Sequence, residues 1–283
     1  MKTEDELIEA LLDLAFAEDI GDGDHTTLCC IPANKEGKAK LLIKEDGILA
    51  GVEIAKRVFH KFDPNMRVEV LLNDGARVKK GDVAFYVTGK EQSLLQTERT
   101  VLNIMQRMSG IATQTNKYAS LLDGLHTKVL DTRKTTPGLR ILEKQAVKIG
   151  GGKNHRIGLF DMILLKDNHV DFAGGIENAI TKAKEYLKAN GKDLKIEIEV
   201  RNFDELNEVL RVGGVDRIML DNFNPDDTRK AVRIIDGKYE TESSGGITYE
   251  TLRSYAECGV DYISVGALTH SVKGLDMSLK AVK

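Results

Sequence analysis

The feature that most constrains the fold is a series of short apolar segments in the second half of the chain, each ending in polar residues. The segments are TKVLDTR, DMILLKDNH, LKIEIEV, DRIMLDN, YETESSGG and DYISVGALTH, and patterns with a helical period lie between them. They end at Arg133, Lys166, Glu199, Asp221, Ser244 and Gly266, so they recur every 33, 33, 22, 23 and 22 residues. Such spacings are typical of a strand followed by a helix. The series therefore predicts parallel strands with helical crossovers.

Six strand-helix units in succession favour a closed barrel, and an open doubly wound sheet is the alternative. In a barrel, the carboxyl ends of all strands face one rim, where the loops build the active site. The polar ends of the six segments are therefore the first place to look for chemistry.

The first part of the chain has a different pattern. A helical period predicts a helix over residues 4–18, and a period of two over residues 38–90, with EDG and NDG turns, predicts a small antiparallel sheet. Residues 91–123 return to a helical period, and Gly110 is expected to break that helix. The turn NDGARVKKGD resembles those of biotinyl and lipoyl carriers, but it lacks their Met-Lys context.

Composition and charge narrow the classes of partner. A net charge of -3 and a pI near 6.1 give no overall attraction to nucleic acid or to an anionic membrane. No run approaches the roughly 20 apolar residues of a membrane span, and the acidic N-terminal helix is unlike a signal peptide. The three cysteines, of which Cys29 and Cys30 are adjacent, have no metal-ligand spacing and no derivable role. We expect a cytoplasmic protein with reduced thiols.

Cations gather where the predicted strands end. Arg133, Lys134 and Arg140 follow the first segment, although Arg140 could instead pair with Glu143 on a helix face. Further cations at the same rim are expected from Lys153, His155, Arg156, Lys166, His169 and His270. His169 is expected to cap a helix or order a loop. A cationic pocket in a mildly acidic protein predicts a substrate with several negative charges.

Carboxylates and small residues complete the rim. Glu197, Glu199 and Asp221 could provide oxygen ligands for Mg²⁺. Glu197 and Glu199 share one face of their strand, and either could instead pair with a cation inside the barrel. The strings SSGG and VGALTH offer backbone amides that can approach a phosphate closely.

Several strings together resemble the quinolinate phosphoribosyltransferase family. They are EDIGDGDHTT, ERTVLNIMQRMSGIAT, DTRKTTPGLRILEKQAV, GGGKNHRIGLFDMILLKDNH, IEIEV, IMLDN, SSGGIT and VGALTHS, in order along nearly the whole chain. The resemblance implies an α/β fold with an N-terminal α/β sandwich over residues 1–110 and an incomplete TIM-like α/β barrel over residues 111–272. The segment 273–283 would return to the first domain.

The resemblance also implies substrates and roles. These are quinolinate and phosphoribosyl pyrophosphate, with Mg²⁺ as cofactor, in a homodimer. Quinolinate would be bound by Arg133, His155, Arg156 and Lys166, with Arg99 reaching into the partner subunit's site. Lys134 would contact the pyrophosphate, while Glu199 and Asp221 would arrange Mg²⁺ and the ribose hydroxyls. Ser244, Gly245, Gly266 and His270 would surround the 5-phosphate.

Three other functions compete with this one. A phosphoribosyltransferase-like protein associated with molybdenum transport shares DTRKTTPGLR, but the strings NHR, KDNH and THS favour quinolinate. A Schiff-base aldolase could use Lys166 as its nucleophile. A carrier or binding module based on the N-terminal sheet lacks a cofactor lysine in context.

Overall fold

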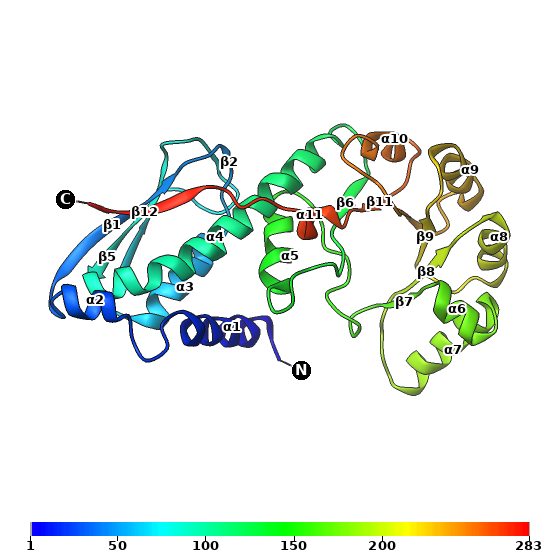
Figure 1. Cartoon of the computed structure of the whole chain (residues 1–283). Helices are drawn as coiled ribbons and strands as arrows, with labels where there is room; N and C mark the ends of the chain where they lie inside the picture. The colour runs from blue at the N-terminus through cyan, green and yellow to red at the C-terminus, as the bar shows by residue number, and fades with distance from the viewer. Residues whose placement is uncertain (1, 283) are drawn as a thin grey trace. The chain divides into compact units, whose positions relative to one another are not determined.

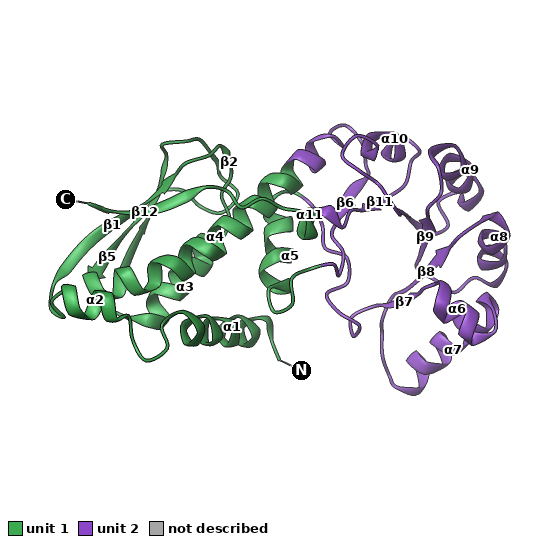
Figure 2. Cartoon of the chain, viewed as in Figure 1, with its two compact units in different colours: residues 1–116, 135–151, 268–283 green, residues 117–134, 152–267 purple. Residues whose placement is uncertain are grey.

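The computed structural model describes residues 2–282, which form two compact units. Unit 1 takes in the chain up to Asn116, the segment Thr135–Gly151 and the residues from Leu268 onward; unit 2 consists of Lys117–Lys134 and Gly152–Ala267 (Figure 2). The chain therefore passes from one unit to the other more than once.

Unit 1 combines antiparallel strands with helices (Figure 1). Its strands are β1 (Glu36–Ile43), β2 (Gly47–Ile48), β3 (Arg67–Val70), β4 (Arg77–Val78), β5 (Val83–Lys90) and β12 (Met277–Val282). Its helices are α1 (Glu4–Asp19), α2 (His25–Cys30), α3 (Val52–Phe62), α5 (Arg140–Ile149), most of α4 (Glu91–Ser120) and most of α11 (Ala267–His270). The predicted helix over residues 4–18 and the predicted antiparallel sheet are confirmed.

The main sheet of unit 1 has the order β12-β1-β5-β3. The last strand, β12, runs antiparallel to β1, with Met277 opposite Ile43 and Val282 opposite Lys38. The end of the chain thus lies beside a strand that begins at Glu36. The segment Thr135–Gly151 also groups with this unit, although it falls inside the range predicted for the barrel, because α5 contacts α1.

The core of unit 1 lies between the sheet and α3. The buried face of α3 includes Val52, Ala55, Val58 and Phe59, which recur at the three- and four-residue spacing of one helix face. The ring of Phe59 meets that of Phe85 on β5 edge-to-face, with centroids 6.0 Å apart. Burial of this apolar face holds the helix on the sheet.

The expected break at Gly110 is wrong, because α4 runs without interruption from Glu91 to Ser120. A Cβ atom at Gly110 would lie 2.3 Å from the carbonyl oxygen of Lys273. The glycine therefore allows the backbone near Lys273 to pack closely against α4, and it does not end the helix.

Unit 2 is built on a sheet of six parallel strands with the order β6-β11-β10-β9-β8-β7. The strands are β6 (Lys128–Leu130), β7 (Ile163–Leu165), β8 (Ile196–Val200), β9 (Arg217–Asp221), β10 (Glu240–Ser244) and β11 (Tyr262–Ser264). The helices are α6 (Asp167–Ala173), α7 (Ile176–Ala189), α8 (Phe203–Val212), α9 (Pro225–Ile235) and α10 (Leu252–Ala256). Figure 1 shows α7, α8, α9 and α10 outside the curved row of strands.

The barrel is incomplete, as the family resemblance implied. The number of strands alone had suggested a closed barrel, and that expectation is wrong. In the part of the chain that the structure describes, β6 and β7 end the row and are not paired with each other.

Helix α9 begins after a residue type that commonly caps helices. Asn224 is the N-cap, and its Oδ1 accepts a hydrogen bond from the N–H of Asp227 at 2.9 Å. Within residues 2–282, no helix has both the length and the apolar character that a membrane crossing needs.

Candidate active site

The polar residues that end the parallel strands lie at one edge of unit 2. Lys166 directly follows β7, Glu199 lies near the end of β8, and Asp221 ends β9. Because β7, β8 and β9 pair in parallel, their carboxyl ends point the same way. The Nζ atom of Lys166 lies 3.7 Å from Oε2 of Glu199. The fold therefore brings these two predicted site residues together from neighbouring strands.

Glu199 and Asp221 form a pair of neighbouring carboxylates. Burial, and next the charge of Asp221, raise the pKa of Glu199 above its ordinary value. Asp221 is held in place, because Oγ of Ser244 donates to its Oδ1 at 3.0 Å and Nδ2 of Asn222 donates to its Oδ2 at 2.7 Å. Two neighbouring carboxylates can together bind a divalent cation such as Mg²⁺, which keeps several water ligands and also binds the phosphates of a substrate. These residues therefore fit Mg²⁺.

The guanidinium group of Arg156 lies half-buried beside a second cation. Its Nη1 donates to the carbonyl oxygen of Met162 at 3.2 Å. Burial, and next the positive charge of Arg133, lower the pKa of Arg156. A neighbouring cation disfavours the charged form of a guanidinium, and the charges of Glu197 and Asp161 act on Arg156 in the opposite direction. Arg133 and Lys134 are exposed just beyond β6, where a ligand can reach them.

His155 is buried, and both of its ring nitrogens have partners inside unit 2. The backbone N–H of Arg156 donates to Nδ1 at 2.7 Å, and Nε2 lies 2.9 Å from Oε2 of Glu197. The backbone N–H of His155 donates to Oδ1 of Asp131 at 2.9 Å. An Nδ1 atom that accepts a hydrogen bond carries no proton, so the ring proton lies on Nε2, the nitrogen beside Glu197. Direct contact between His155 and a substrate stays a prediction.

Four buried or nearly buried charged side chains, which we call the inner cluster, lie inside the row of strands: His155, Glu197, Arg217 and Glu242. Nη1 of Arg217 lies 3.0 Å from Oε2 of Glu242 and 4.0 Å from Oε2 of Glu197. Burial raises the pKa of Glu197 to about 7, and burial, followed by the charge of Glu197, raises the pKa of Glu242 to about 8. The cluster therefore retains a proton near neutral pH.

The inner cluster also has the spacing of a metal site. Ligand atoms of His155, Glu197 and Glu242 all lie within 4.8 Å of one another. However, the guanidinium of Arg217 already provides positive charge beside both carboxylates, and its pKa is raised because the surrounding carboxylates outweigh the effect of burial. The protein itself therefore neutralises this cluster.

Two members of the inner cluster, Arg217 and Glu242, were missed by the sequence analysis. Arg217 lies opposite Glu197 on β8 and opposite Glu240 on β10, and its guanidinium carbon lies 4.2 Å from the centre of the Tyr262 ring. The available signal was a charged residue inside each of the strands DRIMLDN and YETESS. Which charges meet depends on the register of three strands, and no local pattern encodes it.

The turn after β10 requires glycine. Gly245 has a φ angle of +95°, and a Cβ atom there would lie 2.2 Å from Oδ1 of Asn222. Gly266 follows β11, the strand next to β10. Ser244, Gly245 and Gly266 thus follow adjacent strands, as a phosphate-binding edge requires.

Two predicted site residues belong to unit 1. Arg99 is exposed on α4, and His270 is exposed at the end of α11, with its Nδ1 2.7 Å from Oγ of Ser271. Their roles beside the residues of unit 2 stay predictions. His169, in contrast, orders the loop after β7 as expected, because its Nδ1 accepts from the N–H of Lys166 at 3.0 Å.

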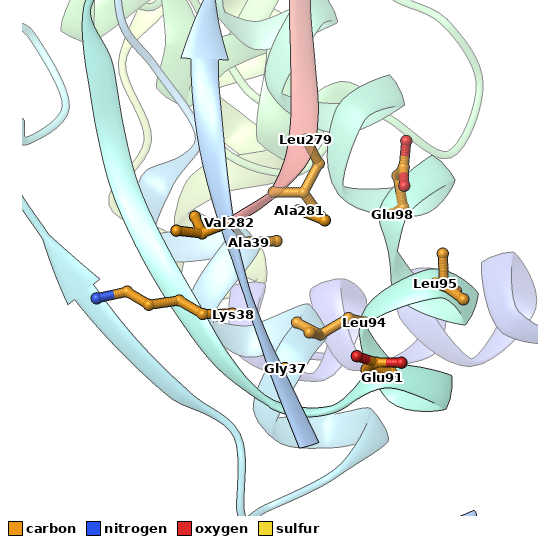
Figure 3. Close-up of a pocket in the computed structure, with 10 residues that line it drawn as sticks. All are labelled: Gly37, Lys38, Ala39, Glu91, Leu94, Leu95, Glu98, Leu279, Ala281 and Val282. Carbon is orange, nitrogen blue, oxygen red and sulfur yellow. The ribbon is translucent and has the colours of Figure 1, made fainter. Parts of the chain in front are cut away.

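Unit 1 also has an apolar groove between α4 and the strands β1 and β12, shown in Figure 3. Leu94 and Leu95 on α4 face Ala39, Leu279 and Ala281 on the strands (Figure 3). Two carboxylates on α4, Glu91 and Glu98, border it. Its lining includes one cation, Lys38, and no arginine, in contrast to the strand ends of unit 2, so we do not assign the reaction to it.

Comparison with known proteins identifies the family. Residues 111–280 match the family model described as quinolinate phosphoribosyl transferase, C-terminal domain, and residues 24–109 match that of the N-terminal domain. A Nicotiana tabacum protein named quinolinate phosphoribosyltransferase (decarboxylating) 1b is 47% identical over 289 residues, which cover 96% of this chain and 82% of that protein.

Solved structures agree with the sequence matches. The crystal structure of NadC from Streptococcus pyogenes is 38% identical, covers 100% of both chains and gives a TM-score of 0.92. The nicotinate-nucleotide pyrophosphorylase from Francisella tularensis is 41% identical, covers 99% of this chain and 98% of its own, and also gives a TM-score of 0.92. The chain therefore belongs to the quinolinate phosphoribosyl transferase family.

Proposed function

We propose that this chain transfers the phosphoribosyl group of phosphoribosyl pyrophosphate to quinolinate with loss of CO₂, giving nicotinate mononucleotide and pyrophosphate in NAD biosynthesis. The observation that carries the proposal is the grouping of Arg133 and Arg156, where burial, and next the charge of Arg133, lower the pKa of Arg156. Quinolinate has two adjacent carboxylates, and arginine binds a carboxylate through two parallel hydrogen bonds.

The remaining residues divide between the two substrates. Lys166 completes the quinolinate side, and Lys134 contacts the leaving pyrophosphate. Glu199 and Asp221 hold Mg²⁺ and the ribose hydroxyls, and the repulsion between their carboxylates supports this assignment. Ser244, Gly245, Gly266 and His270 surround the 5-phosphate.

The reaction needs positioning and charge matching more than a protein nucleophile. The pyridine nitrogen attacks the anomeric carbon while the bond to pyrophosphate breaks, and Lys134 stabilises the charge that develops on the leaving group. When bound, Mg²⁺ would supply further charge stabilisation to the pyrophosphate. The alkylated ring nitrogen is positively charged, so it can accept the electron pair left at C2 when the adjacent carboxylate departs as CO₂.

The test is an assay of the purified protein with quinolinate, phosphoribosyl pyrophosphate and Mg²⁺, following nicotinate mononucleotide and CO₂, with nicotinate as a parallel substrate. We expect product from quinolinate alone, and its loss when EDTA removes Mg²⁺ and its return when Mg²⁺ is restored. A folded protein that forms no product from quinolinate would overturn the proposal.

We further propose a cytoplasmic homodimer in which Arg99 completes the partner subunit's site. The exposure of Arg99 on α4 and the three free cysteines support this assembly and a reducing compartment. Arg99→Ala and Arg133→Ala should each be inactive, whereas mixed dimers should regain partial activity, because one of their two sites has both arginines. Absence of any recovery in dimers shown to have exchanged subunits would place Arg99 in its own subunit's site or outside the site.

A further inference from the structure

The inner cluster has no direct part in the chemistry proposed above, yet it reaches the anion site through His155. Oε2 of Glu197 lies 2.9 Å from Nε2 of His155, and Nδ1 of the same ring accepts from the backbone N–H of Arg156. The imidazole therefore lies between a buried carboxylate on β8 and the backbone of Arg156. With 7% of its side chain exposed, His155 has little surface to offer a ligand.

The other members of the inner cluster surround the carboxylate that lies beside this ring. Nη1 of Arg217 lies 3.0 Å from Glu242 and 4.0 Å from Glu197, so both carboxylates are held by one guanidinium. Arg217 in turn is held by Glu240, with Nη2 3.1 Å from Oε2, and by the face of the Tyr262 ring. Glu197 is fully buried beside these charged groups, so its carboxylate has few alternative positions next to the imidazole.

We propose that His155 is a positioning residue: Glu197, braced by Arg217 and Glu242, holds the imidazole so that its Nδ1 fixes the backbone of Arg156 and places the guanidinium against the carboxylates of the substrate. This gives roles to Glu197, Arg217 and Glu242, which act through His155 and touch no substrate. The kinetic part of the test rests on the function proposed above, and the spectroscopic part does not.

The spectroscopic test reads the protonation of the ring directly. Protein labelled with ¹⁵N-histidine is compared with His155→Asn in long-range ¹H–¹⁵N spectra, which assigns the His155 signals. We expect protonated Nε2 and unprotonated Nδ1 at neutral pH, both without and with saturating quinolinate. A proton on Nδ1 in either state would overturn the inference, whether or not the protein turns over quinolinate.

The kinetic test compares Glu197→Gln, whose amide keeps an oxygen beside Nε2, with Glu197→Leu, which has a similar size and no polar atom. We expect Glu197→Leu to raise KM for quinolinate about tenfold while kcat and KM for phosphoribosyl pyrophosphate stay near wild type, since the polar contact beside Nε2 is lost. Glu197→Gln should stay within about twofold of wild type. Equal KM values for quinolinate in the two variants would overturn the inference.

A second pair of variants covers the case in which Glu197→Leu does not fold. The oxygen of Asn in His155→Asn can occupy the place of Nδ1 and accept from Arg156, whereas the amide of Gln in His155→Gln reaches the place of Nε2 and loses that contact. We expect the lower KM for quinolinate in His155→Asn. A KM in His155→Gln that is equal or lower would mean that Nε2 contacts the substrate, which contradicts the positioning role.

Discussion

Nη2 of Arg107 on α4 lies 2.8 Å from Oε1 of Glu143 on α5, whose side chain is only 1% exposed. The same guanidinium group donates to the carbonyl oxygen of Thr269 at 2.6 Å, and the other carboxylate oxygen of Glu143 accepts from the N–H of Thr136 at 3.2 Å. One ion pair therefore holds two segments of unit 1 against α4: the loop that follows Lys134 and the helix that carries His270.

The first prediction concerns this ion pair. Arg107→Met should lower the free energy of unfolding by about 3–5 kcal/mol, because it leaves the carboxylate of Glu143 buried without its counter-charge. Urea unfolding followed by circular dichroism measures the change. Arg211→Ala is the control, since Arg211 and Glu177 form a pair with side chains 61% and 59% exposed, for which we expect a loss below about 1 kcal/mol. Equal losses in the two variants would contradict the assignment.

The second prediction separates activity from stability at the anion site. Arg156→Ala and Arg133→Ala should each lower kcat/KM for quinolinate by about a hundredfold or more, because one partner of a charge-assisted contact with the substrate is lost. Neither should lower the melting temperature much, since Arg133 is exposed and Arg156 is only half-buried. Steady-state kinetics measures the loss of activity and thermal melting measures the change in stability, with Arg211→Ala as the control for both. Near-normal turnover in Arg133→Ala would remove that residue from the site.

The sequence predicts the rim of the barrel better than its interior. Lys166, Glu199 and Asp221 could be placed because each ends a strand whose apolar run is visible locally, and parallel strands end on one side. His155 and Glu197 were recognised as candidates, but their contact was not, since it depends on a loop after α5 meeting the middle of β8. Long-range register of this kind has no signature in a single sequence.

Local rules also mislead where tertiary contacts override them. The three-residue spacing drew attention to Arg140 as a partner of Glu143 and gave no sign of Arg107, which donates hydrogen bonds to Glu143 from another helix. Nε of Arg140 donates to Oγ1 of Thr135 at 2.9 Å. The expectation that Gly110 breaks its helix fails for the same reason. A helix propensity gives no information about Lys273, which comes 163 positions later in the sequence and packs against Gly110.

The third prediction uses two adjacent glycines as a matched pair. Gly245→Ala should lower the free energy of unfolding by about 1–3 kcal/mol and raise KM for phosphoribosyl pyrophosphate, because the new Cβ would displace Asn222, which holds Asp221. Gly246 has a φ angle of +60° and open space around it, so Gly246→Ala should lower stability by about 1 kcal/mol with KM unchanged. The same KM in both variants would show that the turn after β10 has no part in binding that substrate.

The last prediction concerns the proton held by the inner cluster. Glu242 has a pKa of about 8 in the folded protein against an ordinary value of 4.5, because of burial and then the charge of Glu197. Between these two pH values the folded state binds a proton that the unfolded chain has released. The free energy of unfolding should therefore fall as pH rises through this window, by at most about 1.4 kcal/mol per pH unit for one proton, with the change complete above pH 8.

Urea unfolding at a series of pH values from 5 to 9 measures this slope in the wild type and in two variants of β10. Glu242→Gln should reduce the fall in stability, since its amide does not titrate, and leave the part due to Glu197, whose pKa is raised to about 7. Glu240→Gln should retain it, because Glu240 is only partly buried and its pKa is lowered in the folded protein: the effect of burial is outweighed by the charges and hydrogen bonds of Arg217 and Lys195 together. If the Glu242→Gln profile runs parallel to that of the wild type, the proton belongs to another group, and the charge balance of the inner cluster must be assigned differently.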